Sequence, residues 1–189
     1  MDSMLKRGCF TLRPKVLGAR VHIHWSVFLA IVGLFALWIR HPAHAAVVIV
    51  CYLGLILLHE AGHVWVARRL GYQAENIYLG ILHGVCEVER PDSRRDHALI
   101  AWGGVALQLL VAVPLIALSQ FTPLLSLPFA GIVVATFGYV SLLTVAMNLV
   151  PTHGVDGAFA WKIVPILLAE RRERARARKT AEALFRRLK

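Results

Sequence analysis

The sequence contains few cysteines and few charged residues. Its three cysteines, Cys9, Cys51 and Cys86, lie far apart, and no two of them form a C-x-x-C pair. An odd and scattered set of this kind argues against a disulfide framework and against a cysteine-based metal site. Charged residues make up 17% of the 189 residues, whereas hydrophobic residues make up 58%. This chain is too short for several domains and too apolar for an ordinary soluble protein, so its composition predicts a membrane protein.

Acidic residues are scarce as well, since 11 of them stand against 21 Lys and Arg, a formal net charge of +10. Nearly all the cations lie in three regions, which are residues 1–20, 68–95 and 169–189. We attribute the excess to cytoplasmic segments that flank membrane spans, and not to nucleic-acid binding. The positive-inside rule then predicts that both termini face the cytoplasm. The compact chain fits a multi-pass protein of a prokaryotic cell membrane.

Four apolar stretches are long enough for a helix to cross a hydrocarbon core about 30 Å thick. These stretches are residues 21–39, 45–67, 98–118 and about 128–150. They predict an all-α polytopic membrane protein with about four transmembrane helices. A basic cytoplasmic leader (1–20) precedes the core (21–168), and a basic helical cytoplasmic tail (169–189) follows it. Within the core, residues 158–168 predict a short apolar helix with a kink at Pro165.

The segment between the second and third stretches, residues 73–92, breaks the helical pattern. Ile77, Leu79 and Ile81 alternate with their neighbours, and residues 85–89 alternate again. This pattern predicts a β-hairpin that turns near His83 and Gly84. The hairpin is either a simple cytoplasmic loop or an open strand edge with which an extended peptide could pair through main-chain hydrogen bonds.

The second stretch carries the sequence His59-Glu60-Ala61-Gly62-His63. Positions i and i+4 share one face of a helix, so both imidazoles can reach one metal ion while the Glu serves as a general base. Such a trio deep in an otherwise lipid-compatible helix costs several kcal/mol unless it has partners or a function. The pattern is typical of zinc peptidases. The alternative is a chance match or a polar cluster that holds helices together.

A catalytic zinc ion takes three protein ligands, so a third donor must come from elsewhere in the chain. Asp156 is the best candidate by topology, because the second and fourth stretches end on the same side of the membrane. His153 is the rival. In the third stretch, Gly103 and Gly104 predict close helix packing. Gln108 needs a hydrogen-bond partner in hydrocarbon, so it either holds helices together or contacts a substrate.

Two of these motifs resemble those of the site-2 proteases, the intramembrane zinc metalloproteases of peptidase family M50. The family's His-Glu-x-x-His is matched by His59, Glu60 and His63. Its distal Asn-x-x-Pro-x-x-x-x-Asp-Gly is matched by Asn148, Pro151, Asp156 and Gly157. Its Gly-Pro-x-x-Asn appears here in altered form over residues 104–108, with Gln108 in the place of the asparagine.

The resemblance implies one Zn²⁺ per chain, bound by His59, His63 and Asp156, with Glu60 as the catalytic base. It further implies that Asn148 positions a substrate strand and that Gln108 is a second substrate-binding residue. The hairpin is implied to be membrane-associated. The implied activity is hydrolysis of a peptide bond within or near a transmembrane segment of a membrane-protein substrate, in regulated intramembrane proteolysis. An inhibitory or regulatory membrane partner is compatible with this activity.

The alternative function is that of a proteolytically inactive membrane scaffold or a metal-handling membrane protein. Its support is a set of scattered histidines, which are His22, His24, His41, His44, His83 and His97. Zinc passage would favour polar residues along several spans, yet the interior of the first stretch holds none beyond Ser26.

Overall fold

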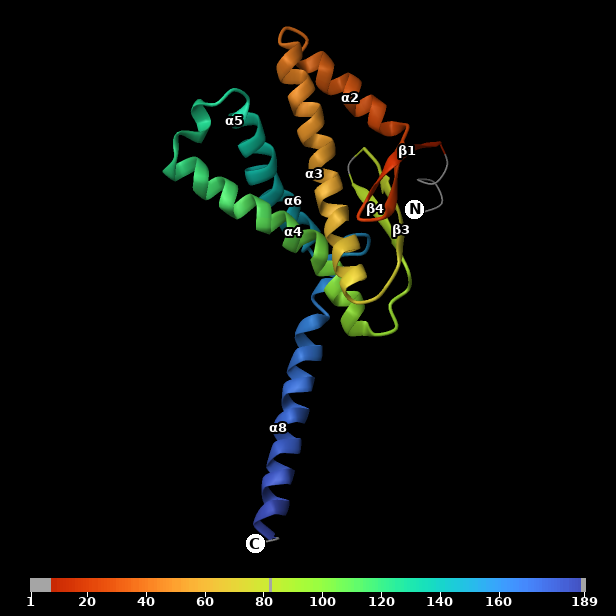
Figure 1. Cartoon of the computed structure of the whole chain (residues 1–189), viewed down its shortest axis with the longest axis vertical. Helices are drawn as coiled ribbons and strands as arrows, with labels where there is room; N and C mark the ends of the chain where they lie inside the picture. Colours follow the sequence, from red (N-terminus) through yellow and green to blue (C-terminus); the bar gives the residue numbers. More distant parts are fainter. Residues whose placement is uncertain (1–7, 82, 188–189) are drawn as a thin grey trace.

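The structure, a computed structural model, describes residues 8–81 and 83–187. In that part of the chain three helices are long and apolar enough to cross a membrane. They are α3 (Pro42–Arg69), α4 (Arg94–Phe121) and a composite helix over Ala130–Asn148. The composite helix joins α5 (Ala130–Val133), the π-helical segment η2 (Val134–Val140) and α6 (Ser141–Asn148). These three helices correspond to the second, third and fourth predicted stretches, and the chain is a membrane protein (Figure 1).

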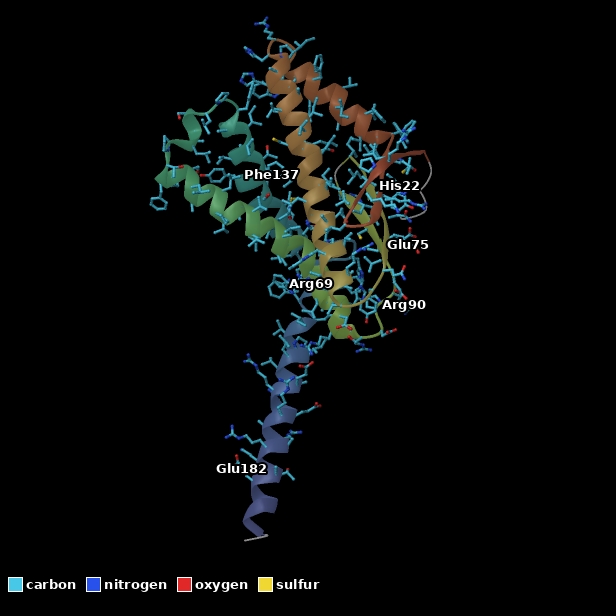
Figure 2. The ribbon with its side chains drawn as sticks, viewed as in Figure 1. His22, Arg69, Glu75, Arg90, Phe137 and Glu182 are labelled. Carbon is cyan, nitrogen blue, oxygen red and sulfur yellow. The ribbon has the colours of Figure 1, made fainter. Side chains whose placement is uncertain are left out.

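Helices α3 and α4 cross with their backbones in contact. A Cβ atom added to Gly62 would lie 2.3 Å from the carbonyl oxygen of Gly103, so only glycine fits at this crossing. The close packing expected at Gly103 is therefore present. The composite helix packs on α3 through Phe137, whose ring would lie 2.9 Å from a Cβ atom on Gly54 (Figure 2). The three helices thus hold one another at fixed spacings.

A four-stranded sheet lies beside α3 (Figure 1). Its strands, in spatial order, are β1 (Cys9–Val16), β2 (Ala19–His24), β3 (Ala74–Leu79) and β4 (Gly84–Val88). Strands β2 and β3 are parallel, and the other two pairs are antiparallel. Val21 and Ile77 pair across β2 and β3 and pack with Ile56 and Val64 of α3 in one apolar cluster. The sheet therefore has a buried face on α3 and two edges, β1 and β4.

The first predicted transmembrane helix, residues 21–39, is wrong. Its first part is strand β2, and the rest forms α2 (Ser26–Leu37), which has 12 residues. A helix of that length spans about 18 Å, well short of a hydrocarbon core. The segment is a strand because it pairs with β1 on one side and β3 on the other, and His22 Nε2 adds a side-chain contact of 3.0 Å to Asn76 Oδ1 on β3. The fold is mostly helical with a four-stranded sheet, not all-α, and the expected boundary at residue 20 falls inside β2.

The segment between α3 and α4 holds strands β3 and β4, which pair antiparallel. Between them, the backbone N–H of Gly80 donates to the carbonyl of His83 over 3.0 Å. Leu82 lies outside the described residues. The hairpin is not isolated, because β3 also pairs with β2, and β4 is left at the edge of the sheet.

The chain after Asp156 forms α7 (Gly157–Ala160) and α8 (Ile163–Arg187). Helix α8 projects away from the rest of the chain (Figure 1). The short helix expected over residues 158–168 is instead divided between α7 and the start of α8. Pro165 falls in the first turn of α8, where its missing N–H has no intrahelical partner to lose, so it does not kink a helix interior. One helix therefore runs across the expected boundary between core and tail.

Candidate metal centre

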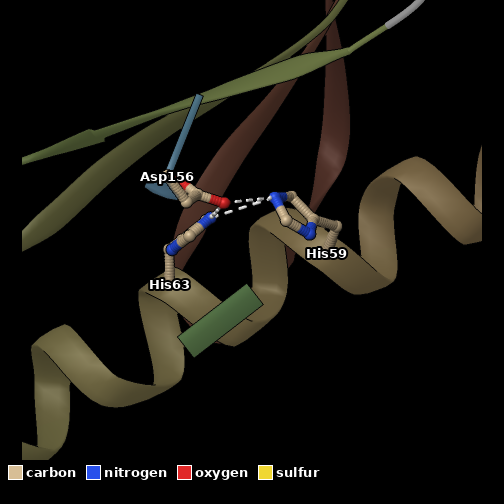
Figure 3. Close-up of side chains that lie close together, drawn as sticks. All are labelled: His59, His63 and Asp156. Atoms are coloured by element: carbon tan, nitrogen blue, oxygen red, sulfur yellow. Dashed lines mark hydrogen bonds and ion pairs between the residues drawn. The ribbon is translucent and has the colours of Figure 1, made fainter. Parts of the chain in front are cut away.

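Three side chains converge at the surface of α3. His59 Nε2 and His63 Nε2 lie 3.2 Å apart, and Asp156 Oδ2 lies 3.0 Å from the first and 3.4 Å from the second. Figure 3 shows the two imidazoles projecting from successive turns of one helix toward the carboxylate. Among the described residues, these three are the group of His, Cys, Asp or Glu side chains placed to hold one metal ion.

The outer nitrogen of each imidazole determines which tautomer is present. His63 Nδ1 lies 2.7 Å from the carbonyl oxygen of Ile100, which can only accept, so Nδ1 carries the proton and donates. His59 Nδ1 lies 3.0 Å from Gln108 Oε1 and donates to it in the same way. In both neutral imidazoles the lone pair is therefore on Nε2, the nitrogen that faces Asp156.

The converging atoms are thus three acceptors with no donor between them. Asp156 Oδ2 is buried and receives no hydrogen bond. Three lone-pair atoms at these separations repel one another unless a cation lies between them, and two imidazole nitrogens with one carboxylate oxygen form a known zinc ligand set. The donor set therefore fits Zn²⁺, and the hydrogen bonds at Nδ1 hold both rings in the orientation that binding requires.

Asp156 is held in place by the residues that follow it. Trp161 Nε1 donates to the carbonyl of Leu149 over 2.6 Å, and Trp102 Nε1 of α4 donates to the carbonyl of Ala160 over 2.9 Å. Burial raises the pKa of the Asp156 carboxyl, but the two histidines that face it outweigh burial when they are protonated and hold that pKa well below its usual range. Asp156 is therefore a carboxylate whether a proton or a metal ion lies beside it.

Gln108 of α4 contacts residues of both α3 and α6. Its side chain is 1% exposed, its Oε1 accepts from His59, and its Nε2 donates to Thr144 Oγ1 over 3.1 Å. Thr144 in turn donates to the carbonyl of Ser141 over 2.9 Å, so its oxygen is free to accept from the amide. This chain of contacts favours a positioning role of Gln108 toward His59 and fits the alternative of a link between helices. A substrate contact of Gln108 stays a prediction.

Replacing Gln108 by Leu is expected to weaken zinc affinity about 10–100-fold, because His59 loses the acceptor that orients its ring. Gln108→Glu keeps an acceptor oxygen at the same reach and should retain most of the affinity. The measurement is competition for zinc against a fluorescent chelator in detergent. Unchanged affinity in a folded Gln108→Leu protein would contradict the positioning role.

Glu60 lies beside the three ligands and against the hairpin. It is 4% exposed, and a Cβ atom on Gly84 of β4 would come within 2.5 Å of its Cγ. The absence of a side chain at Gly84 therefore leaves room for Glu60. Both residues line a cavity of about 420 Å³, together with His59, His63 and Asp156. The cavity brings a buried carboxylate, a cation site and the edge strand β4 to one place.

The remaining predicted site residues lie outside the convergent group. His153 is exposed and is not part of the group of described residues that could share a metal ion. Asn148 is the last residue of α6 and is half-buried. Asn148 in a substrate contact stays a prediction.

Comparison with known proteins relates part of the chain to a peptidase family. Residues 47–127 match the family model of peptidase family M50. This range contains His59, Glu60 and His63, whereas Asp156 lies beyond it. A zinc metalloprotease of Methanocaldococcus jannaschii is 24% identical over 144 residues, which cover 76% of this chain and 42% of that protein. The matched region thus spans about two fifths of the curated relative.

The fold itself has a counterpart among solved structures. A site-2 protease from Methanocaldococcus jannaschii superposes with a TM-score of 0.67 at 23% sequence identity. The superposition covers 86% of this chain and 72% of that chain. The likeness extends over nearly all of the structure, so it concerns the arrangement of sheet and helices as a whole.

Proposed function

We propose that the chain is a member of the site-2 protease family, peptidase family M50, and a zinc metalloendopeptidase acting in the membrane, a proposal that the family match over residues 47–127 and the two relatives support. It hydrolyses a peptide bond within or near a transmembrane segment of a membrane-protein substrate, in regulated intramembrane proteolysis. The observation that carries this proposal is the convergence of three unprotonated ligand atoms beside Glu60 on one cavity. A membrane protein that inhibits or regulates the enzyme is part of the proposal.

The chemistry follows from the residue types. When bound, Zn²⁺ supplies a Lewis acid that polarises the scissile carbonyl and makes water a better nucleophile near neutral pH. His59, His63 and Asp156 would hold the ion. The Glu60 carboxylate takes a proton from the attacking water as the C–O bond forms, and it gives a proton to the leaving amine as the C–N bond breaks.

The edge strand β4 supports the choice of an extended substrate. A transmembrane helix has its peptide groups hydrogen-bonded internally, so it must unwind locally before its carbonyl can be attacked. Within the described part of the sheet, β4 pairs with β3 alone, and its residues Gly84, Val85, Cys86 and Val88 line the catalytic cavity. A substrate strand paired with β4 would be held straight beside Glu60. We propose that Asn148 supports this strand.

The orientation of the site follows from the charge distribution. Helix α3 ends with two cations, Arg68 and Arg69, and α4 begins with two more, Arg94 and Arg95. Under the positive-inside rule these helix ends face the cytoplasm, and so do the metal centre and the C-terminal tail that follow the third spanning helix. Cleavage is accordingly proposed near the cytoplasmic face of a prokaryotic cell membrane.

The scattered histidines give little support to a metal-handling function. His22 lies 2.9 Å from Thr11 Oγ1 and 3.0 Å from Asn76 Oδ1, and His24 lies 2.7 Å from Ser26 Oγ. Both are engaged in hydrogen bonds at the sheet and the start of α2.

The proposal is tested without a known substrate by comparing membranes from a bacterial host that makes the wild-type protein with membranes from the empty host. We expect new protein N-termini that map to transmembrane segments, and we expect a zinc chelator to suppress them. Mass spectrometry of labelled N-termini is the measurement. New N-termini confined to soluble domains, or unaffected by zinc removal, would contradict intramembrane cleavage by this site.

A further inference from the structure

A second cavity, of about 630 Å³, lies beside the catalytic one. Its charged lining consists of three cations and one carboxylate, which are Arg90, Arg94, Lys162 and Asp92. Figure 2 shows Arg90 on the loop that leads from the hairpin to α4. The cavity is therefore positively charged, and no step of the proposed hydrolysis uses it.

These cations have no anionic partner among the residues that the structure describes. Arg95, their neighbour, pairs with Glu170 at 3.5 Å, whereas Arg90, Arg94 and Lys162 form no ion pair there. Lys162 Nζ instead lies 4.5 Å from the centre of the Phe159 ring. Three like charges around one cavity repel one another, so a bound anion would lower the energy of this arrangement.

The basic cavity and the catalytic cavity share a wall. Pro91, His97 and Phe159 line both of them, and the rings of His97 and Phe159 stack with their centres 4.2 Å apart. A peptide in the catalytic cavity can therefore continue past this wall into the basic one without leaving the protein surface.

The edge strand β4 gives the distance from Glu60 in the catalytic cavity to Arg90 in the basic cavity. Gly84, the first residue of β4, lies against Glu60, and Arg90 comes six positions later, just beyond the end of the strand. An extended chain advances about 3.3 Å per residue, so about six substrate residues separate the attacked carbonyl from Arg90.

We propose that the basic cavity is a specificity subsite that binds an acidic side chain of the substrate about six residues from the cleaved bond. This inference rests on the proposed function, because it takes the same peptide to occupy both cavities. A carboxylate suits the lining, since the planar guanidinium of an arginine can donate two parallel hydrogen bonds to it while Lys162 adds a compact charge. Because Asp92 offsets one of the three cations, the lining has a net charge of about +2 and suits one or two acidic groups.

The shared wall favours a peptide over a lipid headgroup as the occupant. A headgroup would need access to the basic cavity alone, whereas residues common to both cavities serve a ligand that extends from one to the other. The anionic lipid is therefore treated as a competing outcome of the test.

Binding is measured on the full chain in detergent, loaded with zinc and carrying Glu60→Gln so that the probe stays intact. The probes are fluorescein-labelled peptides with a Leu/Ala transmembrane segment and a flank that carries either two Asp or two Asn. We expect the Asp peptide to bind about tenfold more tightly, as one good charged contact would provide. The preference should decrease as salt rises.

The discriminating variant is Arg90→Glu with Lys162→Glu, and the matched control is Arg172→Glu with Arg176→Glu on α8. Both pairs change the net charge equally, but the control residues are exposed on the tail and line neither cavity. We expect the cavity variant to lose the preference for Asp and the control to keep it. Should the cavity variant fail to retain zinc, Arg90→Gln with Lys162→Gln replaces it.

Three results would overturn the subsite. The first is equal binding of the Asp and Asn peptides. The second is a loss of the Asp preference in the tail control that equals the loss in the cavity variant. The third is a cavity variant whose only change is weaker binding to phosphatidylglycerol vesicles, which would assign the cavity to a lipid. These results leave hydrolysis itself untouched. A protein that prefers the Asp peptide but cleaves no membrane protein would instead refute the proposed function and retain an acidic-peptide site.

The spacing is tested with active wild-type protein and mass spectrometry of the products. Moving the Asp pair by two positions along the flank is expected to move the cleaved bond by two residues in the same direction. A cleavage site that stays fixed in the sequence while the acidic pair moves would overturn the proposed distance.

Discussion

Replacing Glu60 by Gln is expected to lower the rate of hydrolysis about 10²–10⁴-fold, the usual contribution of a general acid–base group. Gln has nearly the same shape, so it should keep the contact with Gly84 in the catalytic cavity. It cannot take the proton of the attacking water or protonate the leaving amine. The new N-termini found in membranes with wild-type protein should therefore disappear.

The control for this variant is its metal content. Glu60 is not part of the convergent group of His59, His63 and Asp156, so we expect the zinc content measured by atomic absorption to equal that of the wild type. Turnover that persists in Glu60→Gln would refute the acid–base assignment. Loss of zinc together with turnover would show that Glu60 supports the ligands.

Replacing Asp156 by Ala is expected to reduce the zinc content of purified protein from about one ion per chain to almost none, because a catalytic zinc site needs three protein ligands. The two histidines come from one helix and are held by Ile100 and Gln108, so they remain in place without the third ligand. Circular dichroism should show unchanged helix content.

His153→Ala is the matched control, since His153 lies three residues earlier on the same connection but outside the convergent group. It should bind zinc as the wild type does. Zinc that is retained in Asp156→Ala but lost in His153→Ala would make His153 the third ligand and overturn the arrangement described here.

The parts of the fold that depend on local pattern were predictable from the sequence. Long apolar runs around residues 45–67 and 98–118 indicate helices directly, and the i, i+4 spacing of His59 and His63 places both imidazoles on one face. Asp156 could be proposed from topology, but choosing it over His153 required the family resemblance. The geometry of its carboxylate is new information from the structure.

The first predicted transmembrane helix failed because its outcome depends on residues far away in the sequence. An apolar run is ambiguous between a strand and a helix, and Val21 becomes part of a strand by pairing with Ile77. The residues near position 21 do not indicate that Ile77 is the pairing partner. Strand β1 is a second case. Residues 9–16 have the composition of a basic leader, and they form a strand because they pair with β2.

The roles of side chains between helices were equally inaccessible. The sequence shows that Gln108 needs a partner, but whether it turns toward His59 or toward a cavity depends on the rotation of α4 about its axis. That rotation depends on contacts with other helices, among them the close approach of Gly62 and Gly103. The basic cavity depends on Lys162 lying near the start of α4, which no local pattern indicates.

The three residues of the metal centre lie far apart in the sequence, so the ribosome makes them at different times. His59 and His63 are made early, and at roughly 5–20 residues per second a ribosome reaches Asp156 on the order of ten seconds later. During that interval the nascent chain holds two imidazoles without the carboxylate that completes the group. Under the proposed function, a nascent chain therefore cannot cleave neighbouring membrane proteins before Asp156 has been made.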